Sequence, residues 1–255
     1  MKIIACYSNK GGVGKTAVSV NLAYVLAAAG YRTLLCDLDP QGASSFYFRV
    51  KPSKKLTEAS FFKDVEKFTK AIRGSDYDNL DILPANMSFK DFDVFLSRMR
   101  NSRSRLKKAL NSVEKDYDVI VLDCPPSIST LSESVFRCSD LVLVPVIPTT
   151  LSQRTFEQLL KFFKDNDLSL DKLKGFFSMV QGVKALHNET MEEMTSEHKK
   201  RFLKTHIPFA SSVERMGILR APVVATSPST AASQAYQELF AEITGKGSKL
   251  RLKSR

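Results

Sequence analysis

The sequence has few cysteines and no long apolar run, and each shortage excludes a class of protein. Its four cysteines form no CxxC pair and no metal-binding spacing, so a cluster held by thiolates is not expected. They are Cys6, Cys36, Cys124 and Cys138, and we expect them to be structural thiols. No apolar stretch could cross a bilayer, and the N-terminus lacks the pattern of a signal peptide. We therefore expect a soluble, cytoplasmic protein.

Acidic residues are also in short supply. The chain has 27 Asp and Glu against 38 Lys and Arg, which gives a formal net charge of +11. Such an excess suggests a polyanionic surface partner, either nucleic acid or an acidic membrane, with a generically basic protein as the alternative. The segment 98–108, RMRNSRSRLKK, is densely basic and compatible with a helix.

The order of apolar runs indicates the fold class. At 255 residues the chain fits one large α/β domain, and it shows no internal repeat and no linker. Helical patterns separate most of the strand-like runs, which predicts a single-domain, doubly wound, mostly parallel sheet with helices on both faces. The runs are 2–7, 33–37, 80–83, 118–123, 141–146, 175–180 and 202–208. We expect the domain to occupy 1–244 and a short basic tail to occupy 245–255.

Residues 9–16, NKGGVGKT, directly follow the first apolar run and are typical of a phosphate-binding loop. Three glycines in four positions allow positive φ and close backbone approach to an anion. We expect Lys15 to reach the β/γ oxygens and the Thr16 hydroxyl to bind Mg²⁺. The following helix, 15–29, presents its positive N-terminus to the same anion, and Gly30 is a natural stop.

The loop departs from the regular pattern at its first two positions. Asn9 stands where a glycine is usual, and next to it Lys10 adds a second cation. Taken from the residues alone, Lys10 is either a solvated surface lysine or a group that reaches a second nucleotide.

Carboxylates follow two further strand-like runs. In a parallel sheet, ligands bind at the carboxyl ends of the strands. Asp37 and Asp39 lie after the second run, where an Asx-type turn at Asp39-Pro40 is a compatible alternative. Asp123 ends the run 118–123 and resembles a Walker-B carboxylate that holds a water ligand of Mg²⁺. Its alternative is a cap for the turn before two prolines.

Three motifs together resemble the deviant Walker-A ATPases, and within them the ParA/Soj partitioning branch. They are KGGVGKT at 10–16, DLDPQG at 37–42 and VIVLDCPPS at 119–127. The similarity extends from Met1 to about Ile243 through THIPFASSV and PVVATSPSTAASQAYQELFAEI. It implies ATP and Mg²⁺ as cofactors and slow ATP hydrolysis stimulated by a partner protein.

The resemblance also implies roles for residues. Lys10 would contact the nucleotide of a second subunit across an ATP-dependent homodimer, and Asp39 would orient the attacking water. Asp37 would support the outer shell of a metal held by Thr16 and Asp123. The implied catalytic residues are Lys10, Lys15 and Asp39. The implied nucleotide-binding residues are Lys10, Gly11, Gly12, Val13, Gly14, Lys15, Thr16, Ala17, Met179 and Pro208.

DNA contacts are harder to assign. Where Soj-like sequences carry arginines that contact DNA, this chain has Ser212 and Val213. Nearby cations are candidates to replace them, each with a solvated surface cation as the alternative. They are Lys199, Lys200, Arg201 and Lys204, expected on the helix before the Ile-Pro pair, with Arg215 and Arg220 after it.

The leading hypothesis is a nucleoid-associated ATPase that binds DNA without sequence preference as an ATP dimer and releases it on hydrolysis. It would segregate or position DNA or a large protein cargo with a ParB-like or cargo-adaptor protein. A MinD-like membrane-surface ATPase is the first alternative, but the tail offers only Leu250 and Leu252 as apolar anchors. The second is a metabolic ATP-dependent ligase.

Overall fold

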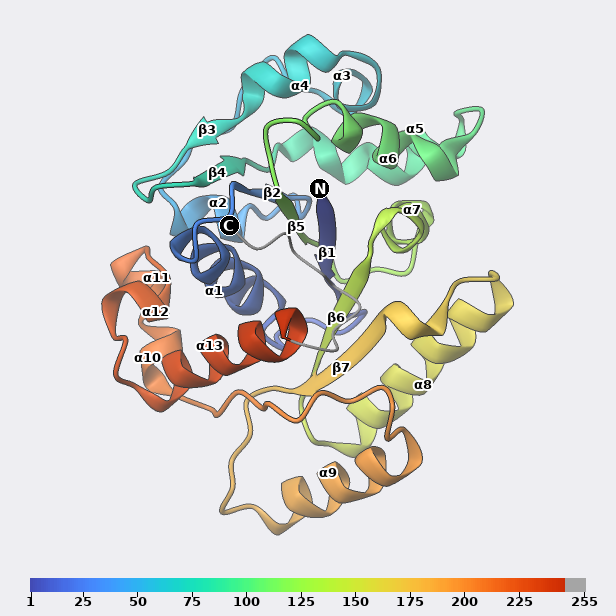
Figure 1. The fold of residues 1–255 in the computed structure, drawn as a ribbon. Helices are drawn as coiled ribbons and strands as arrows, with labels where there is room; N and C mark the ends of the chain where they lie inside the picture. Colours follow the sequence, from blue (N-terminus) through green and yellow to red (C-terminus); the bar gives the residue numbers. More distant parts are fainter. Residues whose placement is uncertain (246–255) are drawn as a thin grey trace.

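A twisted sheet forms the centre of the computed structural model, which describes residues 1–245 (Figure 1). The sheet has seven strands in the order β3-β4-β2-β5-β1-β6-β7, and β3 alone is antiparallel to its neighbour. The strands are β1 (Lys2–Cys6), β2 (Thr33–Asp37), β3 (Arg73–Gly74), β4 (Leu80–Leu83), β5 (Val119–Asp123), β6 (Leu141–Val146) and β7 (Leu173–Phe177). Because helices cover both faces, β2, β5 and β6 are buried along their whole length.

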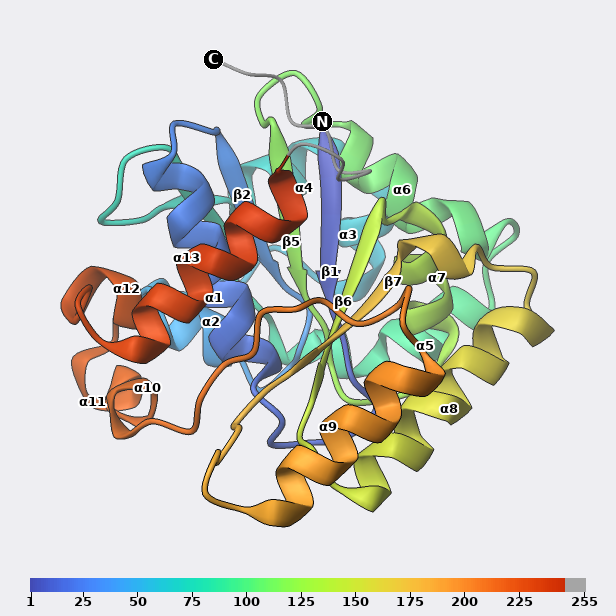
Figure 2. The same ribbon diagram turned by 60° about the horizontal axis from the view of Figure 1, so that its bottom comes forward.

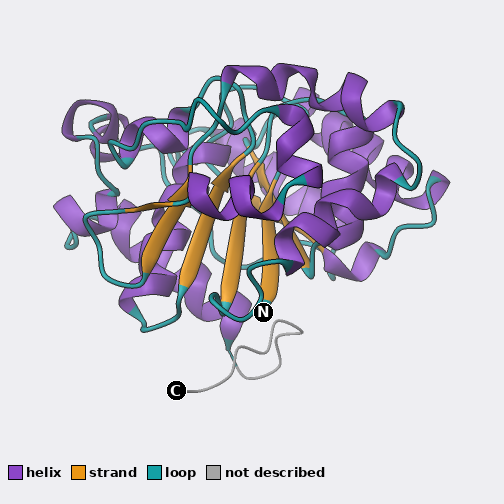
Figure 3. Cartoon of the chain, turned by 90° about the horizontal axis from the view of Figure 1, so that it is seen from above, coloured by secondary structure: helices purple, strands orange, loops and turns teal. Residues whose placement is uncertain are grey.

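The two faces of the sheet carry separate hydrophobic clusters, and Figures 2 and 3 show helices on both sides of the strands. One face packs against α3 (Glu58–Lys63), α4 (Val65–Ala71), α5 (Phe92–Ser97), α6 (Ser102–Asn111), α7 (Thr130–Cys138), α8 (Thr150–Asp165) and α9 (Ala185–Glu197). The other packs against α1 (Lys15–Ala28), α2 (Ala43–Tyr47), α10 (Ser211–Glu214), α11 (Met216–Leu219), α12 (Val223–Thr226) and α13 (Ala231–Thr244). Short 3₁₀ turns lie at η1 (Met87–Asp91) and η2 (Leu170–Lys172). The doubly wound, mostly parallel sheet expected from the sequence is confirmed.

Two sequence-based expectations about local structure are wrong. The run 202–208 forms no strand: it makes isolated bridges from Phe202 to Gly175 and from Pro208 to Val180. Separate backbone hydrogen bonds, such as Ile207 N to Phe177 O at 2.8 Å, also join it to β7. Helix α9 ends at Glu197, so Lys199, Lys200, Arg201 and Lys204 lie in the irregular segment that follows it. Apolar runs of this length predict burial, but a ladder also needs continuous backbone pairing with a neighbouring strand.

The four cysteines are buried and free, as expected for structural thiols. Among residues 1–245, no helix combines the length and apolarity needed to cross a membrane. Residues 246–255, which make up nearly all of the expected basic tail, lie outside the described part of the chain.

Candidate nucleotide site

The candidate site lies where three adjacent strands end. Strands β2, β5 and β1 are neighbours in the sheet, and the loop 9–16 begins shortly after β1. The register places Asp37 of β2 and Cys6 of β1 on either side of Asp123. The three sequence motifs lie at 10–16, 37–42 and 119–127, with at least twenty residues between one and the next. They therefore meet at one edge of the sheet although they are distant in the chain.

Lys15 is the buried cation of the loop. It is the first residue of α1 and is 8% exposed. Its Nζ donates to the backbone oxygen of Lys10 at 3.1 Å, so the side chain folds back along the loop. Burial lowers the pKa of Lys15, and the negative charges of Asp123 and Asp39 oppose that shift. An anion bound in the loop would add a further counter-charge to this amine.

The glycines leave the space that a phosphate needs. A Cβ added at Gly11 or Gly12 would meet no atom within 4 Å, so the loop backbone is open to a ligand there. Gly14 has φ +96, and a Cβ at this position would lie 3.0 Å from Ser178 Oγ. A side chain at Gly14 is excluded by both its backbone conformation and its neighbour.

The side chain of Lys10 contacts a helix outside the phosphate loop. Its Nζ lies 3.3 Å from Ser152 Oγ, in the first turn of α8. The backbone N–H of Lys10 donates to Ser8 Oγ at 3.2 Å, which fixes the loop at the lysine's own position. The side chains of Lys10 and Lys15 therefore contact different partners within one subunit.

Asp123 is a carboxylate with both oxygens already engaged. It is 1% exposed, and its Oδ2 and Oδ1 accept from Ser44 Oγ at 2.6 Å and Ser19 Oγ at 3.1 Å. Burial raises the pKa of Asp123, while hydrogen bonds from Ser44, Thr16 and Ser19 act in the opposite direction. The site thus assembles hydroxyls from α1 and α2 around one Walker-B-type carboxylate.

Asp37 is fully buried at the end of β2, and only one of its two carboxylate oxygens has hydrogen-bond partners among the described residues. Its Oδ2 accepts from Ser45 N at 2.8 Å and Ser45 Oγ at 2.7 Å. Its Oδ1 has no hydrogen-bond partner among the described residues. Burial, then the charge of Asp123, raises the pKa of Asp37 to about 7. Asp37, which carries this orphaned carboxylate oxygen, is paired in register with Asp123, whose carboxylate is hydrogen-bonded to the Thr16 hydroxyl. Two carboxylates and a hydroxyl form a donor set that suits Mg²⁺ and its water ligands.

Asp39 lies beyond the strand, in the loop that leads to α2. Its Oδ1 accepts from Gln41 N at 3.0 Å and its backbone oxygen from Gly42 N at 2.9 Å. The Asx-type turn considered from the sequence is confirmed. The carboxylate is only half-buried and its charge acts on Lys15, so the turn also directs a negative group toward the phosphate loop.

A pocket next to the start of α1 brings together the residues expected near the base. Ala17, Met179 and Pro208 all line it. The backbone pairs here, with Val180 N donating to Ile207 O at 3.0 Å and Phe209 N to Val180 O at 2.9 Å. The pocket also includes residues that sequence reasoning missed: Ser178, Phe209, Ala210, Val213, Glu214 and Tyr236. Val213, one of the two positions at which the sequence resemblance implied arginines in relatives, thus lines this pocket.

The six candidate DNA-contacting cations differ in whether their side chains are exposed or bonded within the protein. Lys199, Lys200, Lys204 and Arg215 are exposed. Arg201 donates from Nη1 to Leu170 O at 2.9 Å. The guanidinium of Arg220 lies 4.5 Å above the Phe46 ring, and its Nε donates to Phe46 O at 3.0 Å. The side chains of Arg201 and Arg220 are therefore engaged in contacts within the protein.

Comparison with known proteins places this geometry in a family. A sequence family described as an AAA domain matches residues 1–174. The sporulation initiation inhibitor protein Soj of Bacillus subtilis (strain 168) is 30% identical over 253 residues, which cover 96% of this chain and 99% of Soj. The structure of cobyrinic acid a,c-diamide synthase from Mycobacterium smegmatis with bound ATP analogue and magnesium is 25% identical. It has a TM-score of 0.77 and covers 94% of this chain and 93% of that one.

MinD from Pyrococcus horikoshii, complexed with Mg-ADP, shares the fold at 21% identity and a TM-score of 0.76, with 95% of each chain covered. The class is therefore that of the P-loop ATPases with a deviant Walker-A loop. Within it, this chain belongs to the ParA/Soj-like partitioning ATPases of the MinD/ParA family.

Proposed function

We propose that this partitioning or positioning ATPase works as an ATP-sandwich dimer that binds DNA without sequence preference. Hydrolysis, stimulated by a ParB-like or cargo-adaptor protein, releases the DNA. The observation that carries the proposal is the position of Lys10. Its amine contacts the neutral hydroxyl of Ser152 in α8, whereas the amine of Lys15 contacts the backbone of the loop. In this proposal Lys10 exchanges that neutral partner for the nucleotide of a second subunit.

In this proposal each residue of the site has one task. The N–H groups of the loop and Lys15 bind the phosphates, and the pocket of Ala17, Met179 and Pro208 receives the base. Thr16, Asp123 and Asp37 would hold Mg²⁺ and its waters, and the ion would supply positive charge that neutralises the phosphates. Asp39 orients the attacking water from its turn. Lys10 adds a positive charge across the dimer interface.

A retention experiment tests the proposal. The protein is passed over immobilised random-sequence DNA with and without ATP and Mg²⁺, and pelleted with anionic vesicles in parallel. We expect ATP-dependent DNA retention that weakens by a thousandfold or more between about 50 and 200 mM salt if six or more phosphates are contacted. Vesicle pelleting without DNA retention would instead support a membrane-surface ATPase.

One comparison favours a second candidate. Because the Mycobacterium smegmatis structure is described as a diamide synthase, an ATP-dependent ligase on this fold is tested beside the first proposal. Steady ATP turnover that depends on a small carboxylic acid, and not on DNA or a partner protein, would support it.

A further inference from the structure

The segment 98–108 forms a second cationic surface that the proposed site does not use. It contains no acidic residue and runs from the end of α5 into α6. Its basic residues are Arg98, Arg100, Arg103, Arg105, Lys107 and Lys108. All of them are exposed apart from the half-buried Arg105. We call these six residues the α6 basic surface.

The α6 basic surface is scarcely neutralised by the protein itself. Within residues 1–245, the surface has one ion pair, which joins Arg103 Nε to Glu133 Oε1 at 3.0 Å. Glu133 also pairs with Arg137 at 2.8 Å, so one carboxylate serves two guanidinium groups. Arg105 Nε donates to the backbone oxygen of Arg100 at 3.4 Å, which adds no negative charge.

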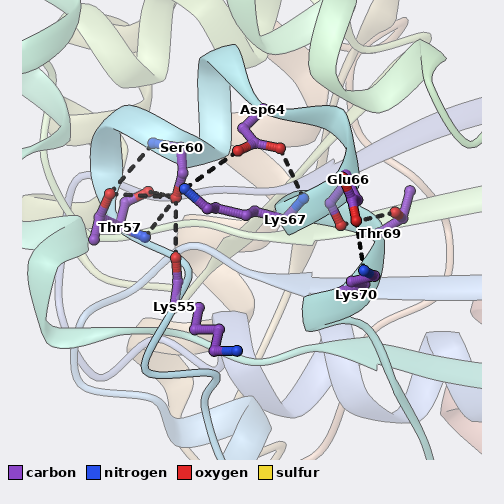
Figure 4. Close-up of polar contacts among 8 residues, drawn as sticks. All are labelled: Lys55, Thr57, Ser60, Asp64, Glu66, Lys67, Thr69 and Lys70. Carbon is purple, nitrogen blue, oxygen red and sulfur yellow. Dashed lines mark hydrogen bonds and ion pairs between the residues drawn. The ribbon is translucent and has the colours of Figure 1, made fainter.

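Neighbouring lysines on α4 behave differently, as Figure 4 shows. Lys67 pairs with Asp64 at 3.3 Å, and Lys70 pairs with Glu66. These lysines are matched to acids three or four residues away, which is the usual arrangement on a solvated helix. Helix α6 contains no such acid, so its lysines and Arg105 have no carboxylate partner within their own helix.

Four of the six cations, Arg103, Arg105, Lys107 and Lys108, lie on a firmly packed helix. Leu106 and Leu110 of α6 are completely buried in the hydrophobic cluster that α6 shares with α3 and α7. Lys108 and Arg105 line a hollow between α6 and the α3–α4 segment, together with Lys63 and with Asp64, which pairs with Lys67. Rigid placement of the cations reduces the entropy lost when they bind.

The α6 basic surface also lies apart from Arg215 and Arg220, the two candidate DNA residues that follow the Ile-Pro pair. Helix α6 covers the sheet face that α3–α9 share, whereas α10 and α11, with Arg215 and Arg220, cover the other (Figure 1). A polyanion bound at one face is therefore separated by the sheet from one bound at the other.

We propose that the α6 basic surface is a second DNA-binding surface, which contacts the phosphate backbone and does not depend on nucleotide-driven dimerisation. This inference rests on the proposed function in taking DNA as the partner. Four of the six cations are arginines, whose planar guanidinium groups match phosphate oxygens in pairs. The apolar residues of the segment, Met99 and Leu106, are half-buried and buried, so it offers no exposed side chain for insertion into lipid.

The test compares two variants with the same change in charge. In the first, Arg98→Gln, Arg100→Gln, Lys107→Gln and Lys108→Gln are combined. In the control, Lys54→Gln, Lys55→Gln, Lys161→Gln and Lys164→Gln remove four exposed lysines from elsewhere on the surface. Fluorescence anisotropy with a random-sequence duplex is measured from about 50 to 200 mM salt, without nucleotide and with ATP and Mg²⁺.

We expect the parent and the control to bind the duplex weakly without nucleotide and more tightly with ATP and Mg²⁺, as the proposed function requires. The first variant should lose the binding without nucleotide, and with ATP its salt slope should fall by about 0.9 for each phosphate contact removed. The melting temperature and basal ATPase rate of the first variant should match those of the control, a result that would exclude misfolding.

Equal slopes for the two variants would overturn the inference while leaving ATP-dependent DNA binding, and with it the proposed function, intact. A parent that binds no DNA in either state would overturn both. Anionic vesicles are the third arm: if the first variant loses vesicle binding as much as it loses duplex binding, the surface is not specific for DNA and the inference fails.

Discussion

Lys10 Nζ lies 3.3 Å from Ser152 Oγ, a contact between residues 142 positions apart. The leading lysine of the phosphate loop is therefore held by α8 of its own subunit. To act across an interface it must give up a neutral hydroxyl partner, which costs little when a triphosphate replaces it. Ser152 sets the position of Lys10 in the single subunit without competing strongly for its charge.

The substitution Lys10→Ala should spare ATP binding but abolish ATP-dependent dimerisation, because in the proposed function the Lys10 amine contacts the nucleotide of the second subunit. DNA retention should fall with it, since two weak faces act together through effective concentration. Light scattering with ATP and Mg²⁺ measures the dimer, and calorimetry measures the nucleotide. Ser152→Ala is the matched control and should still dimerise. A Lys10→Ala protein that dimerises like the parent would make Lys10 an ordinary surface lysine.

Asp39→Asn separates the charge of Asp39 from its turn. An asparagine oxygen can still accept from Gln41 N, the 3.0 Å contact that shapes the loop, but the negative charge is lost. We expect ATP binding and dimerisation to persist while kcat falls by about 10²–10⁴. Asp39→Ala, which also removes the turn contact, should be no more active. Turnover at the parent's rate in Asp39→Asn would remove this carboxylate from the reaction.

The fold could be predicted from the sequence where buried strands leave a continuous apolar signal. The expected runs 33–37, 80–83 and 141–146 match β2, β4 and β6 in full. The two-residue strand β3 was missed, because an edge strand of that length leaves no periodic pattern. The run 202–208 was taken for a strand because apolar composition reports burial without reporting which backbone is its neighbour.

Only part of the candidate site could be predicted from the sequence. Motif residues carry their chemistry in local spacing, so Lys15, Asp37 and Asp123 could be named from the sequence and lie together in the structure. Ser44 could not be named, because its significance comes from a bond to Asp123, 79 residues away. Two adjacent serines after Gly42 were visible in the sequence, yet serines are common in loops and nothing local marks them as buried.

His187 should make the stability of the protein fall in acid. It is 5% exposed, and its Nδ1 accepts from Gln181 N at 3.1 Å. Burial, then the charge of Lys184, lowers its pKa from 6.5. Since the folded pKa is below the unfolded one, this contribution is complete above pH 6.5 and is lost as the pH falls toward the folded value.

Thermal melts between about pH 5 and 8 check this expectation. The parent should lose more melting temperature below pH 6.5 than His187→Asn, whose amide oxygen can accept from Gln181 N without titrating. His206→Asn, at an exposed position, should follow the parent. Parallel pH profiles for the parent and His187→Asn would show that His187 is not the titrating group.

Asp37→Asn should stabilise the protein in the absence of Mg²⁺ and remove much of the stabilisation that Mg²⁺ brings. At pH 8 the parent must keep Asp37 ionised although burial and Asp123 raise its pKa to about 7, and Oδ1 has no partner to offset that cost. An uncharged amide of the same shape avoids the repulsion while its oxygen can still accept from Ser45. We expect a gain of at least about 1 kcal/mol, which is roughly 2–4 °C in melting temperature for a domain of this size.

The measurement is scanning fluorimetry of the parent, Asp37→Asn and the exposed control Asp78→Asn, with ADP constant and Mg²⁺ varied. With Mg²⁺, the parent and control should gain stability by mass action as the ion binds the folded state. Asp37→Asn should gain less, because one of the two carboxylates at the site is missing. A variant that melts below the parent without Mg²⁺, yet responds to the ion as the parent does, would show that Asp37 stabilises the end of β2 and takes no part in holding a metal.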